Sequence, residues 1–320
     1  MLTAKNNSKI SRNDVKDFYS QAALSPQSSL CCPTNYQPED ISHIPEEVLK
    51  ISYGCGSPVK KASIKKGDTV VDLGSGGGID CFIAAKIAGK TGRVIGIDMT
   101  DEMLCKANKH KKQVACNLGY SNIEFRKGHL EDIQVASDSV DIVISNCVIN
   151  LSTTKEKVFE EIFRILNNQG RFVISDIVSD NKVPEKIHSD KKLWGECIAG
   201  AIRQKSLIEI AQTAKFYGVS IEHDYVWKVI NGITFSSITL RGWKFMNNSK
   251  CVYKGQYAIY KGPFQSVSDD ENHTYTIGEP VEICADTMEK LIKPPYEGNF
   301  IIVDAANNNI NAKECGPKCC

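Results

Sequence analysis

The stretch TVVDLGSGGGID runs from Thr69 to Asp80 and is the part of the sequence that decides the fold. Its apolar residues, among them Val71 and Leu73, predict a buried strand. The glycines after them predict a loop that leads into a helix from Ile79. Glycine permits positive φ angles and lets a ligand approach the backbone N–H groups at the start of a helix. The stretch therefore predicts a turn that cradles a nucleotide-like ligand, although a glycine-rich loop alone also fits an ordinary tight turn.

The spacing of the glycines narrows the kind of ligand. A dinucleotide-binding loop has the pattern G-x-G-x-x-G, but the third glycine counted from Gly74 and Gly76 would fall on Ile79. The sequence instead has D-x-G-x-G-x-G from Asp72 to Gly78. This pattern resembles the first motif of the class I S-adenosylmethionine (SAM) methyltransferases, whose ligand has no pyrophosphate.

A second predicted strand, RVIGIDM from Arg93 to Met99, supports a cofactor with a ribose. It carries Asp98 about 20 residues past the loop, which is where an acidic residue hydrogen-bonds ribose hydroxyls. The loop and Asp98 together favour SAM as the cofactor over an ordinary turn.

Composition excludes several classes of protein. The chain has 320 residues, of which 42% are hydrophobic, and this is enough for one large or two ordinary domains. Its 39 lysine and arginine residues nearly cancel its 38 acidic residues, which argues against a nucleic-acid partner. No apolar run is long enough to span a membrane, and the polar N-terminus has no signal-peptide core. We expect a soluble, cytoplasmic monomer.

Cysteine is unusually frequent, with 13 residues and no secretory signal. In a reducing compartment these are expected to be free thiols, metal or metalloid ligands, or redox pairs rather than a disulfide framework. We expect four of them, Cys81, Cys105, Cys116 and Cys284, to be small buried hydrophobic residues.

The sequence predicts that the chain has four regions. Residues 1–64 form an N-terminal cap with cysteine loops, and 65–246 form an α/β domain, a Rossmann-like, doubly wound and mostly parallel sheet. A small, mostly β domain with one helix follows at 250–304, after a linker at 247–249, and 305–320 is a flexible tail with cysteines. Strands are predicted at 69–73, 93–98, 123–127, 140–145, 171–176, 219–229 and 234–245. Helices are predicted at 13–23, 45–51, 79–89, 101–118, 155–167 and 205–217.

Ligands of such sheets bind beyond the carboxyl ends of the strands. Leu130 follows the third strand and is expected to pack on the adenine, with Glu131 or Asp132 accepting from its amino group. Asn146 and Cys147 follow the fourth strand, and Asn146 is expected to hold the cofactor or its own loop. After the fifth strand come Ser175 and Asp176, then the segment WGEC at 194–197.

Glycines on both sides of Cys55 predict a tight, mobile loop with an unshielded thiol that can fold over the same crevice. Tyr53, in the same loop, either lines the sulfonium site or simply packs there.

These motifs together resemble the arsenite SAM methyltransferases over roughly residues 10 to 300. The resemblance is carried by YGCG at 53–56, DLGSGGGIDC at 72–81, GIDMT at 96–100, SNCVINL at 145–151 and WGEC at 194–197. It implies methylation of arsenite and methylarsenite to mono-, di- or trimethylated arsenicals for detoxification. The cofactor-binding residues are then Tyr53, Asp72, Gly74, Ser75, Gly76, Gly78, Asp98, Met99, Leu130, Glu131 and Asn146.

The resemblance also implies that arsenic(III) is bound by the thiolates of Cys55, Cys147 and Cys197. Arsenic(III) is a soft centre that selects thiolates, and three of them leave its lone pair free to accept the methyl group. A further N-terminal catalytic cysteine corresponds to Cys31 or Cys32, with Cys32 preferred. We expect this thiol to form a redox pair with Cys55 that is re-reduced by thioredoxin or glutathione.

Two other functions fit the same residues. A methyltransferase of another small molecule would use the loop and treat the cysteines as structural. A thiol-based metalloid-binding protein would keep the fold without catalysis, and the intact Asp72 and Asp98 argue against it.

Overall fold

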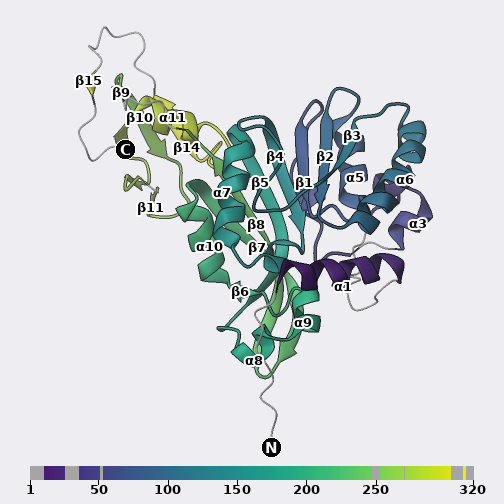
Figure 1. The fold of residues 1–320 in the computed structure, drawn as a ribbon. Helices are drawn as coiled ribbons and strands as arrows, with labels where there is room; N and C mark the ends of the chain where they lie inside the picture. The colour runs from purple at the N-terminus through teal and green to yellow at the C-terminus, as the bar shows by residue number, and fades with distance from the viewer. Residues whose placement is uncertain are drawn as a thin grey trace, which may run out of the picture. The chain divides into compact units, whose positions relative to one another are not determined.

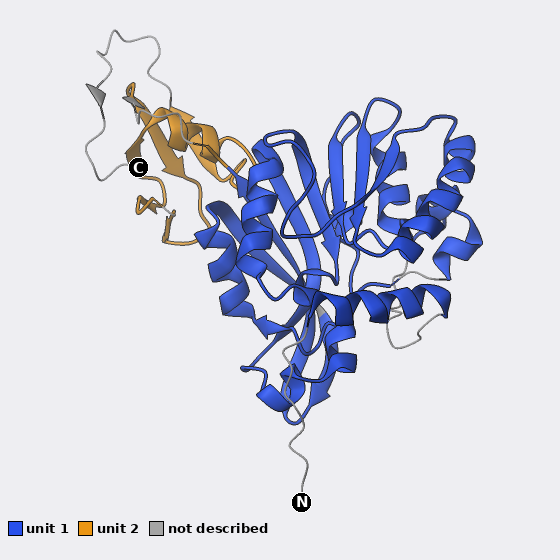
Figure 2. Ribbon diagram, viewed as in Figure 1, with its two compact units in different colours: residues 1–244 blue, residues 245–320 orange. Residues whose placement is uncertain are grey.

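The computed structural model describes residues 11–25, 36–50, 53–246, 252–269, 271–303 and 313–314. Cys31, Cys32, Cys251, the linker at 247–249 and the three cysteines of the tail lie outside these ranges. The chain divides into two compact units, residues 1–244 and 245–320 (Figure 2).

The first unit is built on one eight-stranded sheet (Figure 1). Its strands are β1 (Thr69–Leu73), β2 (Arg93–Asp98), β3 (Ile123–Lys127), β4 (Val140–Asn146), β5 (Leu166–Ser179), β6 (Ile202–Arg203), β7 (Phe216–Ile230) and β8 (Ile233–Lys244). The order is β3-β2-β1-β4-β5-β8-β7, with β6 beside β5. All pairs are parallel except those that β8 makes with β5 and β7. The predicted doubly wound, mostly parallel sheet is confirmed.

The central strands are buried on both faces of the sheet, and successive side chains of each strand point to opposite faces. Val70 packs in one core with α4 (Pro58–Lys61), α5 (Ile79–Ala88) and α6 (Asp101–Leu118). Val71 packs in the other core with α7 (Lys155–Ile165) and α10 (Gln204–Thr213). Each fully buried aliphatic or aromatic side chain stabilises the fold by about 1.5–3 kcal/mol. The rest of the unit comprises α1 (Arg12–Leu24), α2 (Pro38–Ile41), α3 (Glu46–Leu49), η2 (Ile149–Leu151), α8 (Glu185–His188) and α9 (Lys191–Gly195).

Most element bounds follow the sequence pattern, and the differences have physical causes. β5 begins at Leu166 rather than residue 171, because Val140 of β4 pairs with Leu166 across a register irregularity. The helix expected over 205–217 ends at Thr213, since Phe216 already pairs with Lys244 of β8. Of the four-residue helices, α3 lies within the helix predicted at 45–51. The other three, α2, α4 and α8, were not predicted, because they are too short to display a helical period.

Two of the four cysteines expected to be buried are exposed. Cys81 and Cys284 are fully buried, as predicted, but Cys105 and Cys116 of α6 are exposed. The buried face of α6 contains Met103, Leu104, Ala107, His110 and Val114. Residues 105 and 116 lie off this stripe, whose spacing of three to four residues is that of one helix face.

The second unit has its own small core. Strands β13 (Pro280–Ile283), β10 (Gln256–Tyr260) and β14 (Phe300–Val303) form an antiparallel sheet, beside a hairpin of β11 (Ser266–Ser268) and β12 (Thr274–Thr276). The remaining elements are α11 (Ala285–Leu291) and the pair β9 (Val252–Tyr253) and β15 (Lys313–Glu314). Buried Tyr260, Tyr275 and Ile283 pack together at its centre. Cys284 accepts from Thr287 N and so caps α11.

Candidate active site

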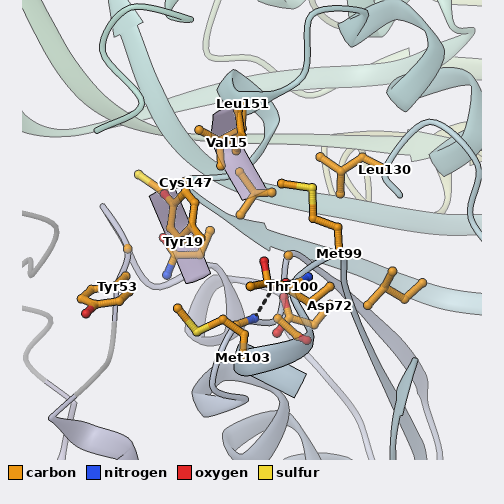
Figure 3. Close-up of a pocket in the computed structure, with 18 of the residues that line it drawn as sticks. Val15, Tyr19, Tyr53, Asp72, Met99, Thr100, Met103, Leu130, Cys147 and Leu151 are labelled. Atoms are coloured by element: carbon orange, nitrogen blue, oxygen red, sulfur yellow. Dashed lines mark hydrogen bonds between the residues drawn. The ribbon is translucent and has the colours of Figure 1, made fainter. Parts of the chain in front are cut away.

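The sheet topology creates a crevice at the carboxyl ends of β1 and β4. These strands are neighbours, but the chain leaves β1 toward β2 and leaves β4 toward β5, so the connections diverge there. A single cavity at this point extends from the glycine loop to Cys147 and Cys197 (Figure 3). It is lined by all the predicted cofactor residues except Gly78: Tyr53, Asp72, Gly74, Ser75, Gly76, Asp98, Met99, Leu130, Glu131 and Asn146.

The glycine loop is held in the conformation that its sequence predicts. Gly74, Gly76 and Gly78 all have positive φ angles, of 73°, 49° and 92°. Gly74 N donates to Ile97 O at 2.8 Å, and Gly76 N donates to Asp98 Oδ2 at 2.9 Å. Gly78 does not line the cavity, in contrast to its expected role. It caps the N-terminus of α5, where an added Cβ would lie 2.7 Å from the Phe125 ring.

Three carboxylates line the cavity near the loop. Asp72 and Asp80 are buried, and burial raises the pKa of both, that of Asp80 to about 6. Burial also raises the pKa of Asp98. Among the described lysines and arginines, none forms an ion pair with these three groups. A cationic ligand is therefore favoured at this end of the cavity.

Other residues of the lining suit an adenosine group. Leu130 and Met103 supply apolar surface. Glu131 lies on the cavity, whereas Asp132, the alternative considered for the same role, does not. The Glu131 carboxylate already accepts from Ser152 Oγ at 2.6 Å and pairs with Arg12 at 3.4 Å.

The residues present fit SAM, which carries an ammonium, a sulfonium and an adenosine. Ser75 Oγ is a buried atom of the glycine loop that lacks a partner within the described part of the chain, so it is free to bind a polar group of the ligand. Tyr19, Tyr53 and Trp227 also line the cavity, and aromatic faces attract cations.

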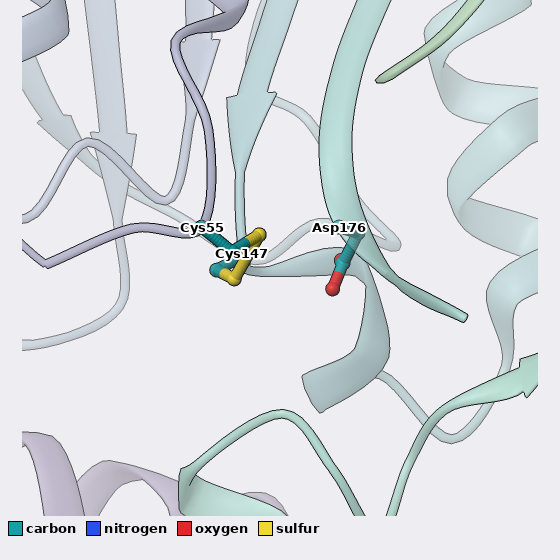
Figure 4. Close-up of side chains that lie close together, drawn as sticks. All are labelled: Cys55, Cys147 and Asp176. Carbon is teal, nitrogen blue, oxygen red and sulfur yellow. A yellow bond between two sulfur atoms is a disulfide. The ribbon is translucent and has the colours of Figure 1, made fainter. Parts of the chain in front are cut away.

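The three candidate arsenic ligands are neighbours, although their three sulfur atoms do not all lie within 4.8 Å of one another. Cys147 and Cys197 line it, and the Cys197 thiol donates to the Cys147 carbonyl oxygen at 2.7 Å. Cys147 is joined to Cys55 by a disulfide, with the two Cα atoms 5.7 Å apart (Figure 4). The expectation of free thiols at Cys55 and Cys147 is thus corrected for this structure, and the pairing expected between Cys32 and Cys55 lies outside the described residues.

Cys55 is also less accessible than its flanking glycines predicted. It is fully buried, because its backbone is fastened on both sides. Its N–H donates to Asn146 Oδ1, and its carbonyl accepts from Tyr225 and Ser237 hydroxyls of β7 and β8. The expectation of an unshielded thiol was wrong, since the groups that bond this backbone come from distant strands.

A buried polar network lies beneath the cysteines. One carboxylate oxygen of Asp176 and the sulfurs of Cys55 and Cys147 all lie within 4.8 Å of one another (Figure 4). The Asp176 carboxylate accepts from the side chain of Asn150 at 2.8 Å, and burial raises its pKa to about 6. Burial lowers the pKa of the nearby Lys155 to about 8.

Helix α1 supplies cavity residues that the sequence did not indicate. Arg12, Val15 and Tyr19 line the cavity, because α1 lies across the carboxyl ends of the strands (Figures 1 and 3). The Tyr19 hydroxyl donates to Gly195 O at 3.1 Å, and Tyr53 OH donates to Ala22 O at 2.9 Å. The sequence predicted the helix but held no signal for where it docks. Trp227, on β7, was missed for the same reason.

The sheet order, the glycine loop and the carboxylate-lined cavity together define a class I SAM-dependent methyltransferase. A family model described as a methyltransferase domain matches residues 64–218, and one described as a domain of unknown function matches residues 247–320. SAM is the cofactor, and it supplies a methyl group on a positively charged sulfur.

Sequence relatives of known activity identify the family within this class. The chain is 30% identical to arsenite methyltransferase of Aquipseudomonas alcaligenes, over 94% of each chain. It is 32% identical to that of Homo sapiens, over 91% of this chain and 83% of the human one. The protein belongs to the arsenite methyltransferase family and is an enzyme.

Solved structures agree with the sequence relatives. The arsenic(III) SAM methyltransferase of Chlamydomonas reinhardtii superposes with a TM-score of 0.63 at 29% identity, covering 91% of this chain and 99% of that one. A phosphoethanolamine methyltransferase of Haemonchus contortus solved with SAM has a TM-score of 0.53 at 17% identity, over 72% of this chain and 60% of that one. This second likeness shows the fold alone. Within the described ranges, every helix is too short or too polar to cross a membrane.

Proposed function

We propose that the enzyme methylates trivalent arsenic that is held by the thiolates of Cys55, Cys147 and Cys197, with arsenite and methylarsenite as substrates. The observation that carries this proposal is that Cys147 and Cys197, 50 residues apart in the sequence, both line the SAM cavity, with Cys55 bonded to Cys147. Soft thiolates suit arsenic(III) better than carboxylate or imidazole does.

The three thiolates position the substrate. They complete the pyramidal coordination of arsenic and leave its lone pair free to attack the methyl carbon, so that no general base is needed. The carbon–sulfur bond of the sulfonium breaks, and its electrons stay on sulfur. Catalysis comes mainly from holding arsenic and methyl group in line within the cavity.

The reaction also needs electrons, because methyl transfer oxidises arsenic to the pentavalent state. The thiolates of Cys55 and Cys147 supply two electrons when they leave arsenic and close to the disulfide, which returns arsenic to the trivalent state. Thioredoxin or glutathione then reduces this disulfide, directly or through Cys32 or Cys31. Repetition of the cycle gives mono- to di- or trimethylated products.

Backbone geometry supports a functional role for two of the ligands. Cys147 and Cys197 have positive φ angles of 57° and 60°, which non-glycine residues rarely adopt. Such conformations cluster at functional sites, where surrounding structure imposes them.

Product analysis tests the proposal. The reduced enzyme is incubated with SAM, arsenite and thioredoxin or glutathione, and methylated arsenicals are separated by mass. Serine substitution of Cys55, Cys147 or Cys197 is expected to lower product formation at least about 100-fold, because each removes a group on which the chemistry depends. Cys105→Ser, which changes an exposed thiol of α6, is the matched control and is expected to keep full activity.

The other outcomes identify the alternatives. Unchanged turnover of another acceptor in the Cys147→Ser and Cys197→Ser variants would indicate a different small-molecule methyltransferase. Stoichiometric arsenite binding without release of S-adenosylhomocysteine would indicate a non-catalytic metalloid-binding protein.

A further inference from the structure

The side chain of Asn146 joins the cofactor cavity to the loop that holds Cys55. Its Oδ1 accepts from Cys55 N at 3.0 Å, and its Nδ2 donates to Gly56 O at 2.9 Å and to Asp80 Oδ2 at 3.1 Å. These bonds use both amide hydrogens and the carbonyl oxygen of Asn146. One carboxamide thus contacts the loop and the carboxylate at the same time.

The loop is shaped to admit this carboxamide. Gly54 packs so closely on Asn146 that an added Cβ would lie 2.5 Å from Nδ2 and 2.8 Å from Oδ1. Any other residue at position 54 would push the side chain of Asn146 away from the loop. This close approach gives a physical reason for the first glycine of YGCG, which its φ angle does not require.

The other end of the link belongs to the cofactor site. Asp80 is buried, lines the cavity and also accepts from the hydroxyl of Tyr36 at 3.3 Å. Within the described part of the chain it has no ion pair, so a bound cation favours its ionised form. A hydrogen bond to an ionised carboxylate is stronger than one to a neutral acid. A cationic cofactor therefore strengthens the bond that orients Asn146.

We propose that Asn146 is a positioning residue that couples cofactor binding at Asp80 to the placement of Cys55, so that SAM assembles the thiol site. This inference rests on the proposed role of Cys55 as an arsenic ligand. By linkage, arsenite binding strengthens SAM binding by the same factor.

The first experiment measures the coupling without turnover. Arsenite affinity of the reduced full-length protein is determined with and without saturating S-adenosylhomocysteine, which keeps the cofactor ammonium but has no methyl group to transfer. The alkylation rate of Cys55 by N-ethylmaleimide is measured by peptide mass, with and without SAM. In the wild type, each quantity is expected to change about fivefold or more on cofactor binding.

In Asn146→Ala, the effect of the cofactor on arsenite affinity and on the alkylation of Cys55 is expected to fall to a factor of about one. The matched control is Asn122→Ala. Asn122 also donates through Nδ2 to two acceptors, the carbonyls of Ala85 and Gly89, but it does not line the cavity. Loss of the coupling in Asn122→Ala to the same extent would overturn the proposal, as would its survival in Asn146→Ala.

A charge exchange keeps the test valid if Asn146→Ala folds poorly. Asn146→Asp places a second carboxylate against Asp80 and is expected to abolish the coupling. Adding Asp80→Asn restores an N–H donor between the two side chains, so the double variant is expected to regain part of it. A double variant no better than Asn146→Asp contradicts the link. If the wild type shows the coupling but forms no methylated arsenical, the proposed function is rejected and the coupling through Asn146 is not.

Discussion

At the scale of single residues, the main feature of the cavity is a group of carboxylates without a positively charged partner among the described residues. Asp72, Asp80 and Asp98 gather beside the glycine loop with their pKa values raised by burial. Keeping them ionised without a cation is costly, so the free protein holds a site that a cationic ligand stabilises. This feature distinguishes the site from a cavity that binds adenosine by shape alone.

The charge of Asp80 predicts a pH-dependent effect of SAM on stability. Its pKa rises from 3.8 to about 6 on folding, so the stability this group contributes is present below pH 4 and lost as pH rises through 6. Bound SAM offsets that loss with positive charge. The increase in Tm caused by saturating SAM is therefore expected to be larger at pH 7.5 than at pH 5, as measured by thermal denaturation. Asp80→Asn should reduce the difference between the two increases in Tm. An increase in Tm that does not depend on pH in the wild type would contradict the prediction.

At the scale of elements, the site depends on how two segments meet the ends of the strands. The loop between β1 and α5 needs positive φ angles and tight packing, since Gly74 lies under the side chain of Val148. Helix α1 closes the cavity through Val15 and Tyr19. The loop is specified locally, whereas the position of α1 depends on contacts such as that between Tyr19 and Gly195.

A comparison of alanine substitutions at two glycines separates the effect of backbone strain from that of packing. Gly74 and Gly119 have φ angles of 73° and 77°, so alanine is strained at both by about 1–2 kcal/mol. An added Cβ at Gly74 would lie 2.4 Å from Val148, whereas at Gly119 it would meet no atom within 4 Å. Gly74→Ala is expected to lower unfolding free energy more than Gly119→Ala, in urea titrations, and to abolish SAM binding in calorimetry. If both variants lose the same unfolding free energy and Gly74→Ala still binds SAM, the packing of Gly74 against Val148 is unimportant.

At the scale of the whole molecule, the residues of the active site and those of the second unit occupy separate parts of the sequence. Every residue that lines the cavity lies between Arg12 and Trp227, within the first unit. The second unit has a core of its own around Tyr260 and Tyr275. Each unit therefore has the hydrophobic interior that independent folding requires.

Truncation tests this separation. A protein ending at Met246 retains all the strands of the large sheet and the whole cavity lining. It is expected to unfold cooperatively and to bind SAM with a Kd within about threefold of the full chain. The measurement is calorimetric titration with SAM. An aggregated product or a loss of affinity above tenfold would mean that the second unit is needed for the fold of the first.

The sequence by itself determined most of the elements and the kind of cofactor. The predicted bounds of β1, β2, β3 and α6 agree with the structure to the residue. Apolar period, glycine position and helix caps are local properties, which a linear pattern records. The positions of Asp72, Gly74 and Asp98 on the cavity follow from the same local rules, because side chains after parallel strands meet at one edge of the sheet.

Only the tertiary structure decided how the thiols are presented. Burial of Cys55, its bond to Cys147 and the contact of its N–H with Asn146, 91 residues away, depend on chain segments that meet through folding. The same holds for the docking of α1 and for the charge left on Asp80. Hydrogen bonds and packing between distant segments leave no period in the sequence, which is why the glycines around Cys55 suggested exposure where the fold imposes burial.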